Sequence, residues 1–360
     1  MKIRRCHRED LEALKVIFAK VYPRNLLLQD NRYLEWQFRK HPWNDENQYT
    51  LFVLEDKDST IQGFYGYVCA KYVVDGGTYQ GCEPAIWWTS SKAGFYGLAL
   101  FQAVTKNQKI SIFMDCSAQS LAVFDKLEIP STKLQRVIGI LNAEKVLKLF
   151  SVTDRDILVS NERKLAAAVK SVHSDEIRTT HNFAKSNTSA LAKFADIRGH
   201  IAYSPEYLQW RYGDIPYHNY QCICTDEGDF AVYRIEPIMD SGANILRIVE
   251  WCVRPSNGKA VLANFRKAAL SMGAVLMDFF CSNTTLSTWF IHDGGFAPQN
   301  AAGMEGVTRW VNPVNAAPPI VAAIDADKAT SIGLHYWYLT TGNGDADRFK
   351  TAIASAKSGI

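Results

Sequence analysis

The sequence predicts an α/β (α+β) protein with two tandem copies of one fold, each a mixed, mostly antiparallel sheet flanked by helices. Three observations support this prediction. The chain has 360 residues, which is more than one hydrophobic core usually organises. Hydrophobic residues make up 47% of it and charged residues 21%, a balance typical of packed globular domains. Finally, one aromatic motif occurs twice along the chain.

The repeated motif is a helical aromatic segment with a proline a few residues later. The first copy reads Tyr-Leu-Glu-Trp-Gln-Phe over residues 33–38, and Pro42-Trp43 follow it. The second reads Tyr-Leu-Gln-Trp-Arg-Tyr over residues 207–212, and Pro216-Tyr217 follow it. Each matched residue lies 174 positions after its counterpart (210 − 36 = 174 for the two tryptophans). A constant offset over several positions indicates a duplicated unit.

The segments after each motif also agree in order. Each half continues with a strand, two long strands joined by a glycine turn, a glycine-bearing turn, a helix, a buried strand and a second helix. The expected strands are 2–6, 49–54, 62–74, 79–88 and 110–115, then 176–179, 220–224, 230–237, 245–253 and 275–280; the expected helices are 9–20, 98–105 and 118–129, then 260–271 and 284–296. The predicted domains are therefore 1–141 and 174–313, with a helical connection at 142–173 and a C-terminal extension at 314–360.

Charge and cysteine usage argue against several classes of protein. The net charge is +3 and no run of five like charges occurs, so we expect no nucleic-acid partner and no polybasic membrane patch. No apolar run approaches the ~20 residues that span a bilayer. The eight cysteines lie mostly in apolar stretches and no signal peptide is recognisable, which favours reduced thiols in a cytoplasmic protein. The eight histidines contain no pair at metal-binding spacing, so no metal site is expected.

The order of elements resembles the GNAT superfamily of acyltransferases over residues 1–141 and 174–313. The resemblance implies a fourth strand that splays from the fifth, followed by a loop whose backbone N–H groups bind the pyrophosphate of acyl-CoA. Such groups form an anion site because they are unpaired at a helix N-terminus. The corresponding loop of the first half gives the cofactor-binding candidates Ser91, Lys92, Ala93, Gly94, Phe95, Tyr96 and Gly97.

The second half has only Gly258 at the corresponding turn. The resemblance therefore favours acyl-CoA binding in the first domain and acceptor binding in the second. An alternative is that Gly94 and Gly97 merely allow close helix–strand packing. The family also often carries a tyrosine, on the helix after the fifth strand, that protonates the leaving thiolate. Phe124 and Ile291 stand at that place here, so either another residue is the acid or CoA leaves as the thiolate.

N-acylation requires a group that takes a proton from the amine. Glu83 and Glu250 lie in apolar stretches of the two fourth strands, either as buried carboxylates of raised pKa or in salt bridges. Asp115 ends the fifth strand of the first half, either facing a cleft or capping a helix. The catalytic candidates are thus Glu83, Asp115, His41 and His292, and the substrate-binding candidates are Trp88, His218, Glu250 and Trp251. An acyl-enzyme on Cys116 is the less common alternative to direct transfer.

The tandem form, the repeated motif and the ending at residues 337–348 resemble proteins of bacterial surface-polysaccharide biosynthesis. This resemblance implies an N-acetyltransferase that uses acetyl-CoA as co-substrate and transfers the acetyl group directly to the deprotonated amine of a nucleotide-linked amino sugar. One alternative is a peptidoglycan-bridge-type transferase that uses aminoacyl-tRNA, against which the small net charge argues. Another is a non-catalytic binding module, which the degenerate loops favour. The sequence does not specify the acceptor sugar, the acyl chain length or the oligomeric state.

Overall fold

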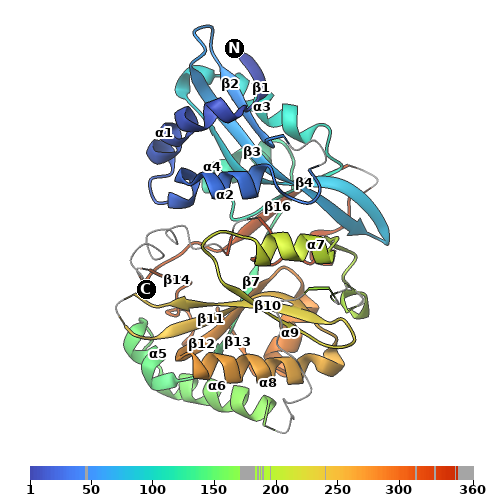
Figure 1. The fold of residues 1–360 in the computed structure, drawn as a ribbon. Helices are drawn as coiled ribbons and strands as arrows, with labels where there is room; N and C mark the ends of the chain where they lie inside the picture. The colour runs from blue at the N-terminus through green and yellow to red at the C-terminus, as the bar shows by residue number, and fades with distance from the viewer. Residues whose placement is uncertain are drawn as a thin grey trace.

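The computed structural model describes residues 1–44, 48–170, 183–184, 186, 188, 190–194, 196–239, 241–312, 314–327, 330–344 and 346–347. The expected strand at 176–179 and the expected domain start at residue 174 lie outside this part of the chain. The fold is α/β, with one large mixed sheet in each half, as the sequence predicted. Figure 1 shows the first half above and the second half below.

The first half contains the expected elements in the expected order. In α1, Leu11, Leu14 and Phe18 are buried along one face, which is the spacing of an amphipathic helix. The side chain of Asp30 caps α2 by accepting a hydrogen bond from the Tyr33 amide. The elements are β1 (Lys2–Arg5), α1 (Leu11–Val21), α2 (Asn31–Phe38), β2 (Leu51–Glu55), β3 (Ile61–Val74), β4 (Gly77–Thr89), α3 (Tyr96–Thr105), β5 (Ile110–Phe113), α4 (Ala118–Lys126) and β6 (Ser131–Lys133).

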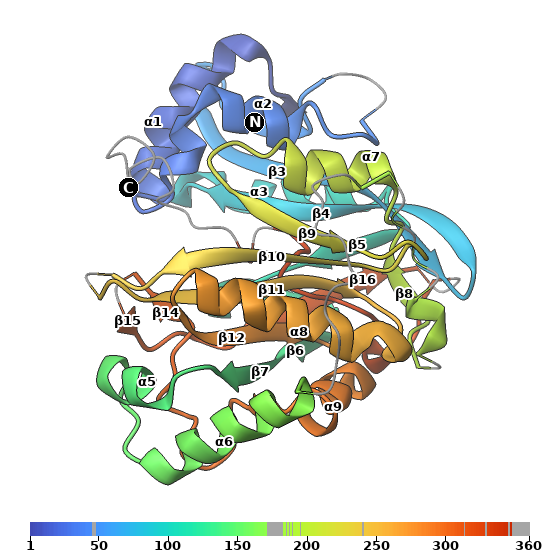
Figure 2. The same ribbon diagram turned by 60° about the horizontal axis from the view of Figure 1, so that its bottom comes forward.

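The second half follows the same order, after the helical connection α5 (Ala143–Leu149) and α6 (Arg155–Ala168). Figures 1 and 2 show α6 and α8 on the side of the second sheet that faces away from the first half. The elements are β8 (Gly199–Ile201), α7 (Pro205–Leu208) with a π-helical continuation (Gln209–Gly213), β9 (Tyr220–Cys224), β10 (Phe230–Pro237), β11 (Asn244–Cys252), α8 (Pro255–Ser271), β12 (Ala274–Cys281), α9 (Thr284–His292), β13 (Ala297–Pro298), β14 (Trp310–Val311) and β15 (Val314–Asn315).

One predicted boundary in this half differs from the structure in a way that matters. Helix α8 begins at Pro255, five residues before the expected start at 260, because proline fits the first helical turn. Gly258 therefore lies inside a helix and not in a loop. A Cβ atom there would come within 2.3 Å of the Trp289 ring, so close packing explains this glycine.

The two sheets exchange strands. The strand β7 (Gln135–Ile140) pairs antiparallel with β12 in the second sheet, and β16 (Val321–Ala326) pairs antiparallel with β5 in the first. The short strand β8 also joins the first sheet, beside β3. The predicted first domain (1–141) thus contributes β7 to the second sheet, and the predicted C-terminal extension (314–360) contributes β16 to the first.

A β-bulge lies at the same place in each sheet. In the first sheet Gly66 pairs with Ile86 while Tyr67 pairs with Pro84, which leaves Ala85 as the extra residue. In the second, the corresponding register shift falls at Val249. The parallel partner strand stays paired only before the bulge, up to Cys82 in β4 and up to Ile248 in β11. Beyond the bulge the two strands separate, since a bulge bends and twists the strand that carries it.

The repeated motif forms the junction between the halves. The indole Nε1 of Trp36 donates to the carbonyl oxygen of Trp210 at 2.8 Å, and Nε1 of Trp210 donates to the carbonyl of Trp36 at 3.1 Å. Their rings stack with centroids 4.9 Å apart, and Trp43 stacks on Tyr207 at 4.7 Å. This reciprocal contact explains why the motif occurs in both halves: each copy binds the other.

Candidate active site

The first half contains an open cleft where β4 and β5 separate. Its volume is about 650 Å³. The end of β4, the loop after β5 and the start of α4 form its walls, with the side chains of Val21 and Tyr22 at one side. Tyr65, Phe113 and Phe124 line it as well and belong to one buried cluster, against which the partly buried Trp87, another lining residue, packs. The expected substrate-binding Trp88 and the expected catalytic Asp115 both line this cleft.

The loop after β4 carries unpaired backbone N–H groups. It follows Thr89, which lines the cleft, whereas the predicted cofactor-binding residues 91–97 are not themselves among the lining residues. Gly94 adopts φ +53° and ψ −129°, a conformation that favours glycine, and nothing lies within 4 Å of the Cβ position. In the described part of the chain, the amides of Gly94, Phe95 and Tyr96 have no hydrogen-bond acceptor. They lie at the N-terminus of the ten-residue helix α3, which begins at Tyr96, so the amide groups and the helix dipole favour an anion there. Gly97 has a different role, since its Cβ position lies 3.1 Å from Thr89 Oγ1 and close packing requires it.

The thiol in this cleft is poorly suited to carry an acyl group. Cys116 lines the cleft, and burial raises its pKa to about 12. A thiol must lose its proton to act as a nucleophile. The Cys116 thiol is therefore a poor nucleophile at neutral pH.

The equivalent cleft of the second half is filled by the protein itself. Residues 337–344, named here the C-terminal segment, pass between the separated ends of β11 and β12. On one side the Ser282 amide donates to the Leu339 carbonyl at 2.9 Å, and on the other the Trp251 amide donates to Tyr338 Oη at 2.9 Å. Trp337, Tyr338 and Leu339 are at most 1% exposed. The second half thus has the splayed strands without the open cleft.

The C-terminal segment also binds the two expected glutamates. Glu250 accepts hydrogen bonds from four hydroxyl groups at 2.7–3.2 Å, those of Tyr203, Tyr212, Tyr338 and Thr340. Glu83 accepts from Asn343 Nδ2 at 3.0 Å and from the Gly344 amide at 3.1 Å. Burial raises the pKa of Glu250 to about 7, although the tyrosine hydroxyls oppose the shift. Both carboxylates are thus buried and bound by the same segment, and neither lines the open cleft of the first half.

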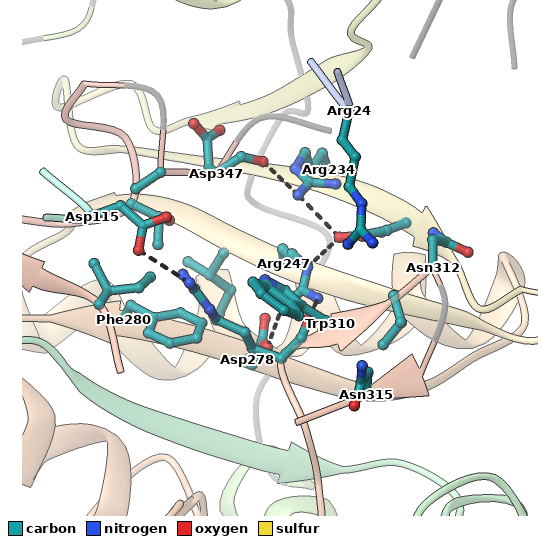
Figure 3. Close-up of a pocket in the computed structure, with 17 residues that line it drawn as sticks. Arg24, Asp115, Arg234, Arg247, Asp278, Phe280, Trp310, Asn312, Asn315 and Asp347 are labelled. Carbon is teal, nitrogen blue, oxygen red and sulfur yellow. Dashed lines mark hydrogen bonds and ion pairs between the residues drawn. The ribbon is translucent and has the colours of Figure 1, made fainter. Parts of the chain in front are cut away.

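A second cavity, of about 310 Å³, lies between the halves (Figure 3). Arg24 and Asp115 reach it from the first half, and the second sheet contributes most of its floor. Its charges form a network in which Arg247 Nη1 and Arg136 Nη2 bind Asp278 Oδ2 at 2.6 and 2.7 Å. Trp310 and Phe280 provide aromatic surface. The lining charged residues are Arg24, Asp115, Arg234, Glu236, Arg247, Asp278, Arg309 and Asp347.

Asp115 lines both cavities and so joins them. It is the second residue after β5 and has φ +51°, an uncommon conformation for a residue other than glycine. Its Oδ1 pairs with Arg309 Nη2 at 3.0 Å. Its neighbour Ser117, and not Asp115, caps α4. A ligand in either cavity can reach this carboxylate.

Comparison with known proteins now bears on this arrangement. No protein-family model matches the sequence, and no curated protein matches it. Among solved structures, *Saccharomyces cerevisiae* N-myristoyltransferase with bound myristoyl-CoA and inhibitors resembles it with a TM-score of 0.51 at 8% identity, over 95% of this chain and 86% of that one. The chain has the GNAT fold.

Two GCN5-related N-acetyltransferases support the same conclusion about the fold. The protein from *Kribbella flavida* gives a TM-score of 0.51 at 11% identity, over 78% of this chain and 63% of its own. The protein from Anabaena variabilis gives a TM-score of 0.50 at 9% identity, over 89% of this chain and 72% of its own. In a GNAT fold the open cleft of the first half corresponds to the splay between the fourth and fifth strands that the sequence predicted.

The remaining predicted site residues lie apart from both cavities. His41 is 3% exposed, contacts Thr50 Oγ1 at 3.3 Å and packs against Trp210, and burial lowers its pKa to about 3. His292 is exposed at the end of α9. His218 stacks beside Tyr220, and Trp251 lies in the core against Phe290. These four residues stay predictions, and Asp115 is the expected catalytic residue that faces a cavity.

Sequence reasoning missed the arginine and carboxylate lining of the second cavity. Arg234, Arg247 and Asp278 occupy strand positions whose neighbours are apolar, and Arg309 lies in a loop. Charged residues inside strands that are otherwise apolar are a usable signal, because charges are rarely buried without partners. The described residues contain no group of three potential metal ligands. No helix in the described ranges is both long and apolar enough to cross a membrane.

Proposed function

We propose that this protein is an acyl-CoA-dependent N-acyltransferase that binds acyl-CoA in the open cleft of the first half. The observation that carries the proposal is the contrast between the two clefts of one fold. The first is open, has the loop with unpaired amides directly after its lining residue Thr89, and shares Asp115 with a second cavity. The second is filled by the C-terminal segment. The acyltransferase structures that share the fold support the same assignment.

In this proposal the loop at residues 91–97 binds the pyrophosphate, and the aromatic walls of the cleft enclose the acyl thioester. Bound acyl-CoA supplies an activated acyl group. The acceptor amine enters from the second cavity and reaches the junction at Asp115. The Asp115 carboxylate orients the amine and accepts its proton, while Arg309 holds the carboxylate in place. Direct attack by the amine is consistent with the high pKa of Cys116.

We further propose that the acyl group is acetyl and that the acceptor is a nucleotide-linked amino sugar of a bacterial surface-polysaccharide pathway. Three buried polar atoms around the second cavity find no partner among the described residues: Arg234 Nε, Arg309 Nε and Asp278 Oδ1. Two donors and one acceptor suit a ligand with several hydroxyl groups and an amine. Trp310 offers a face for a sugar or base, and the exposed Arg24, which forms no ion pair among the described residues, suits a phosphate.

The first test is binding of acetyl-CoA, measured by calorimetry on the full chain. We expect one site per chain. Ser120→Trp, which fills the cleft from α4, is expected to weaken binding at least tenfold, whereas Gln102→Trp, at an exposed position of α3, is not. No binding by the wild type would contradict the proposal and favour a non-catalytic module.

The second test is CoA release with a panel of nucleotide-linked amino sugars. Arg24→Gln is expected to raise the acceptor KM several-fold with kcat nearly unchanged, while Arg163→Gln on α6 serves as the matched control. Release of CoA only with other amines would remove the amino-sugar assignment. Binding of aminoacyl-tRNA without CoA binding would instead favour the peptidoglycan-bridge type of transferase.

A further inference from the structure

Two buried hydrogen-bond donors in the open cleft have no acceptor. Tyr65 Oη and Trp87 Nε1 are both inaccessible to solvent and form no hydrogen bond with any described residue. A buried donor without a partner destabilises the fold, because it has lost its hydrogen bonds to water and gained none in return. Native proteins retain such groups rarely, and two of them in one cavity call for a common explanation.

The pairing of β3 with β4 places the two donors next to each other. Tyr65 on β3 and Trp87 on β4 are cross-strand partners, so their side chains lie on the same face. Their ring centroids are 6.0 Å apart, and both pack against Phe101 of α3. Both residues line the cleft just beyond the bulge at Ala85, where β4 has left its partner strand.

The chemistry of both groups points to a ligand that accepts hydrogen bonds. An indole N–H can only donate. Burial raises the pKa of Tyr65 well above its usual value, so its hydroxyl keeps its proton and remains a donor. The arm that joins the nucleotide of CoA to its sulfur contains two amide groups, and each has a carbonyl oxygen that accepts.

We propose that Tyr65 and Trp87 donate hydrogen bonds to the amide carbonyl oxygens of the pantetheine arm of acyl-CoA. The inference rests on the proposed function, since it assigns residues to the same cleft. It makes both residues positioning residues that fix the arm between the loop at residues 91–97 and Asp115. The orphan donors of the free protein thereby become satisfied in the complex.

The decisive variant is Tyr65→Phe, with Tyr72→Phe as its matched control. Both tyrosines lie on β3 and are fully buried, but Tyr72 Oη already donates to the Cys82 carbonyl at 3.2 Å. Without ligand, Tyr65→Phe is expected to leave the melting temperature unchanged or raise it, because it removes an unpaired donor. Tyr72→Phe is expected to lower it by about 2 °C.

In ligand binding, Tyr65→Phe and not Tyr72→Phe is the variant expected to differ from the wild type. Tyr65→Phe and Trp87→Phe are each expected to weaken binding of both CoA and acetyl-CoA about fivefold to tenfold. Tyr72→Phe should bind both as the wild type does. Adenosine 3′,5′-bisphosphate, which lacks the arm, should bind wild type and Tyr65→Phe equally.

Three outcomes would overturn the inference. Wild-type affinity of Tyr65→Phe for CoA would show that the hydroxyl does not contact the ligand. A loss confined to acetyl-CoA would assign the donors to the thioester and not to the arm. A lower melting temperature of ligand-free Tyr65→Phe would reveal a structural partner. If the wild type bound neither CoA nor acetyl-CoA, both the proposed function and this inference would fail.

Discussion

The two clefts of this protein begin from the same geometry and end differently. In both halves a bulge in the fourth strand of the fold, at Ala85 or Val249, separates that strand from its parallel neighbour. The first cleft remains open and polar at its end. The second is packed with Trp337, Tyr338 and Leu339. A duplicated fold can therefore keep an open cleft in one copy and use the equivalent space as core in the other.

The filling segment also connects the halves. Arg211, which belongs to the second copy of the repeated motif, donates to the Gly342 carbonyl at 2.8 Å and pairs with Asp347 at 2.9 Å. The same segment reaches Glu250 in the second half and Glu83 in the first. The second cleft thus became a support for the first, and each prediction below tests one part of this contrast.

The largest effect is expected from emptying the second cleft. Trp337→Ala removes a side chain that is 1% exposed, so we expect the free energy of unfolding to fall by about 3–5 kcal/mol. Chemical denaturation measures this change. Trp310→Ala, at a tryptophan that is 45% exposed, is the control and should cost about 1 kcal/mol or less.

The same variant tests whether the filled cleft retains any ligand site. Its stoichiometry with acetyl-CoA should remain one per chain, because Gly258 lies within α8 and the second half lacks a glycine loop. Two sites per chain in Trp337→Ala would contradict the view that only the first cleft is built for acyl-CoA.

The next effect concerns the pH dependence of stability through Glu250. The folded state holds its proton up to about pH 7, whereas the unfolded chain releases it near the ordinary value of 4.5. The folded state therefore binds more protons between these values, and the free energy of unfolding falls as pH rises through this window, by about 3 kcal/mol in total. Above pH 7 this contribution is constant.

Glu250→Gln isolates this contribution. Glutamine stays neutral, so the stability of the variant relative to the wild type should increase steadily from pH 5 to pH 7. Denaturant titrations of both proteins at four pH values measure the difference in their free energies of unfolding. The contributions of all other titrating groups cancel in this difference. A difference that does not change with pH would mean that Glu250 is ionised throughout.

Much of the fold could be predicted from the sequence, because it depends on local pattern. The repeat fixed the number of copies, and the alternation of apolar residues located β3, β10 and β12 to within a residue or two. The exchange of β7 and β16 was missed, because pairing between distant strands leaves no local signal. The start of α8 was missed because Gly258 was interpreted as a loop residue, although a helical glycine can serve packing.

The candidate site was less predictable for a physical reason. Asp115 and Trp88 follow from strand ends, and the structure brings both to the open cleft. The role of Glu83 depends on Asn343, 260 positions away, and the role of Glu250 depends on Thr340, 90 positions away. These amide and hydroxyl groups meet the glutamates only after folding. The cavity between the halves likewise combines Arg24, Asp278 and Arg309, which no spacing rule relates.

A smaller effect is expected where the segment supports the first half. Asn343→Ala leaves Glu83 Oε1 without its amide donor, so we expect the free energy of unfolding to fall by about 1–3 kcal/mol. Asn312→Ala removes an exposed hydrogen bond to the Pro237 carbonyl and should change stability by about 0.5 kcal/mol. The affinity of Asn343→Ala for acetyl-CoA, measured by calorimetry, should differ from that of the wild type by less than twofold. A large loss of affinity would mean that the segment shapes the open cleft directly.

The smallest effect is expected from Cys116→Ser, which gives the first half the residue that the second half has at the same place. Cys116 and Ser282 each precede the residue that caps the following helix, Ser117 in α4 and Asn283 in α9. Because burial raises the pKa of the Cys116 thiol to about 12, its thiolate is scarce at neutral pH and should not attack a thioester. We therefore expect the rate of CoA release to change less than twofold, and mass spectrometry of the wild type with acetyl-CoA to show no added acetyl group. An acetylated Cys116, together with loss of turnover in the serine variant, would replace direct transfer by an acyl-enzyme and would give the open cleft a nucleophile that the filled cleft lacks.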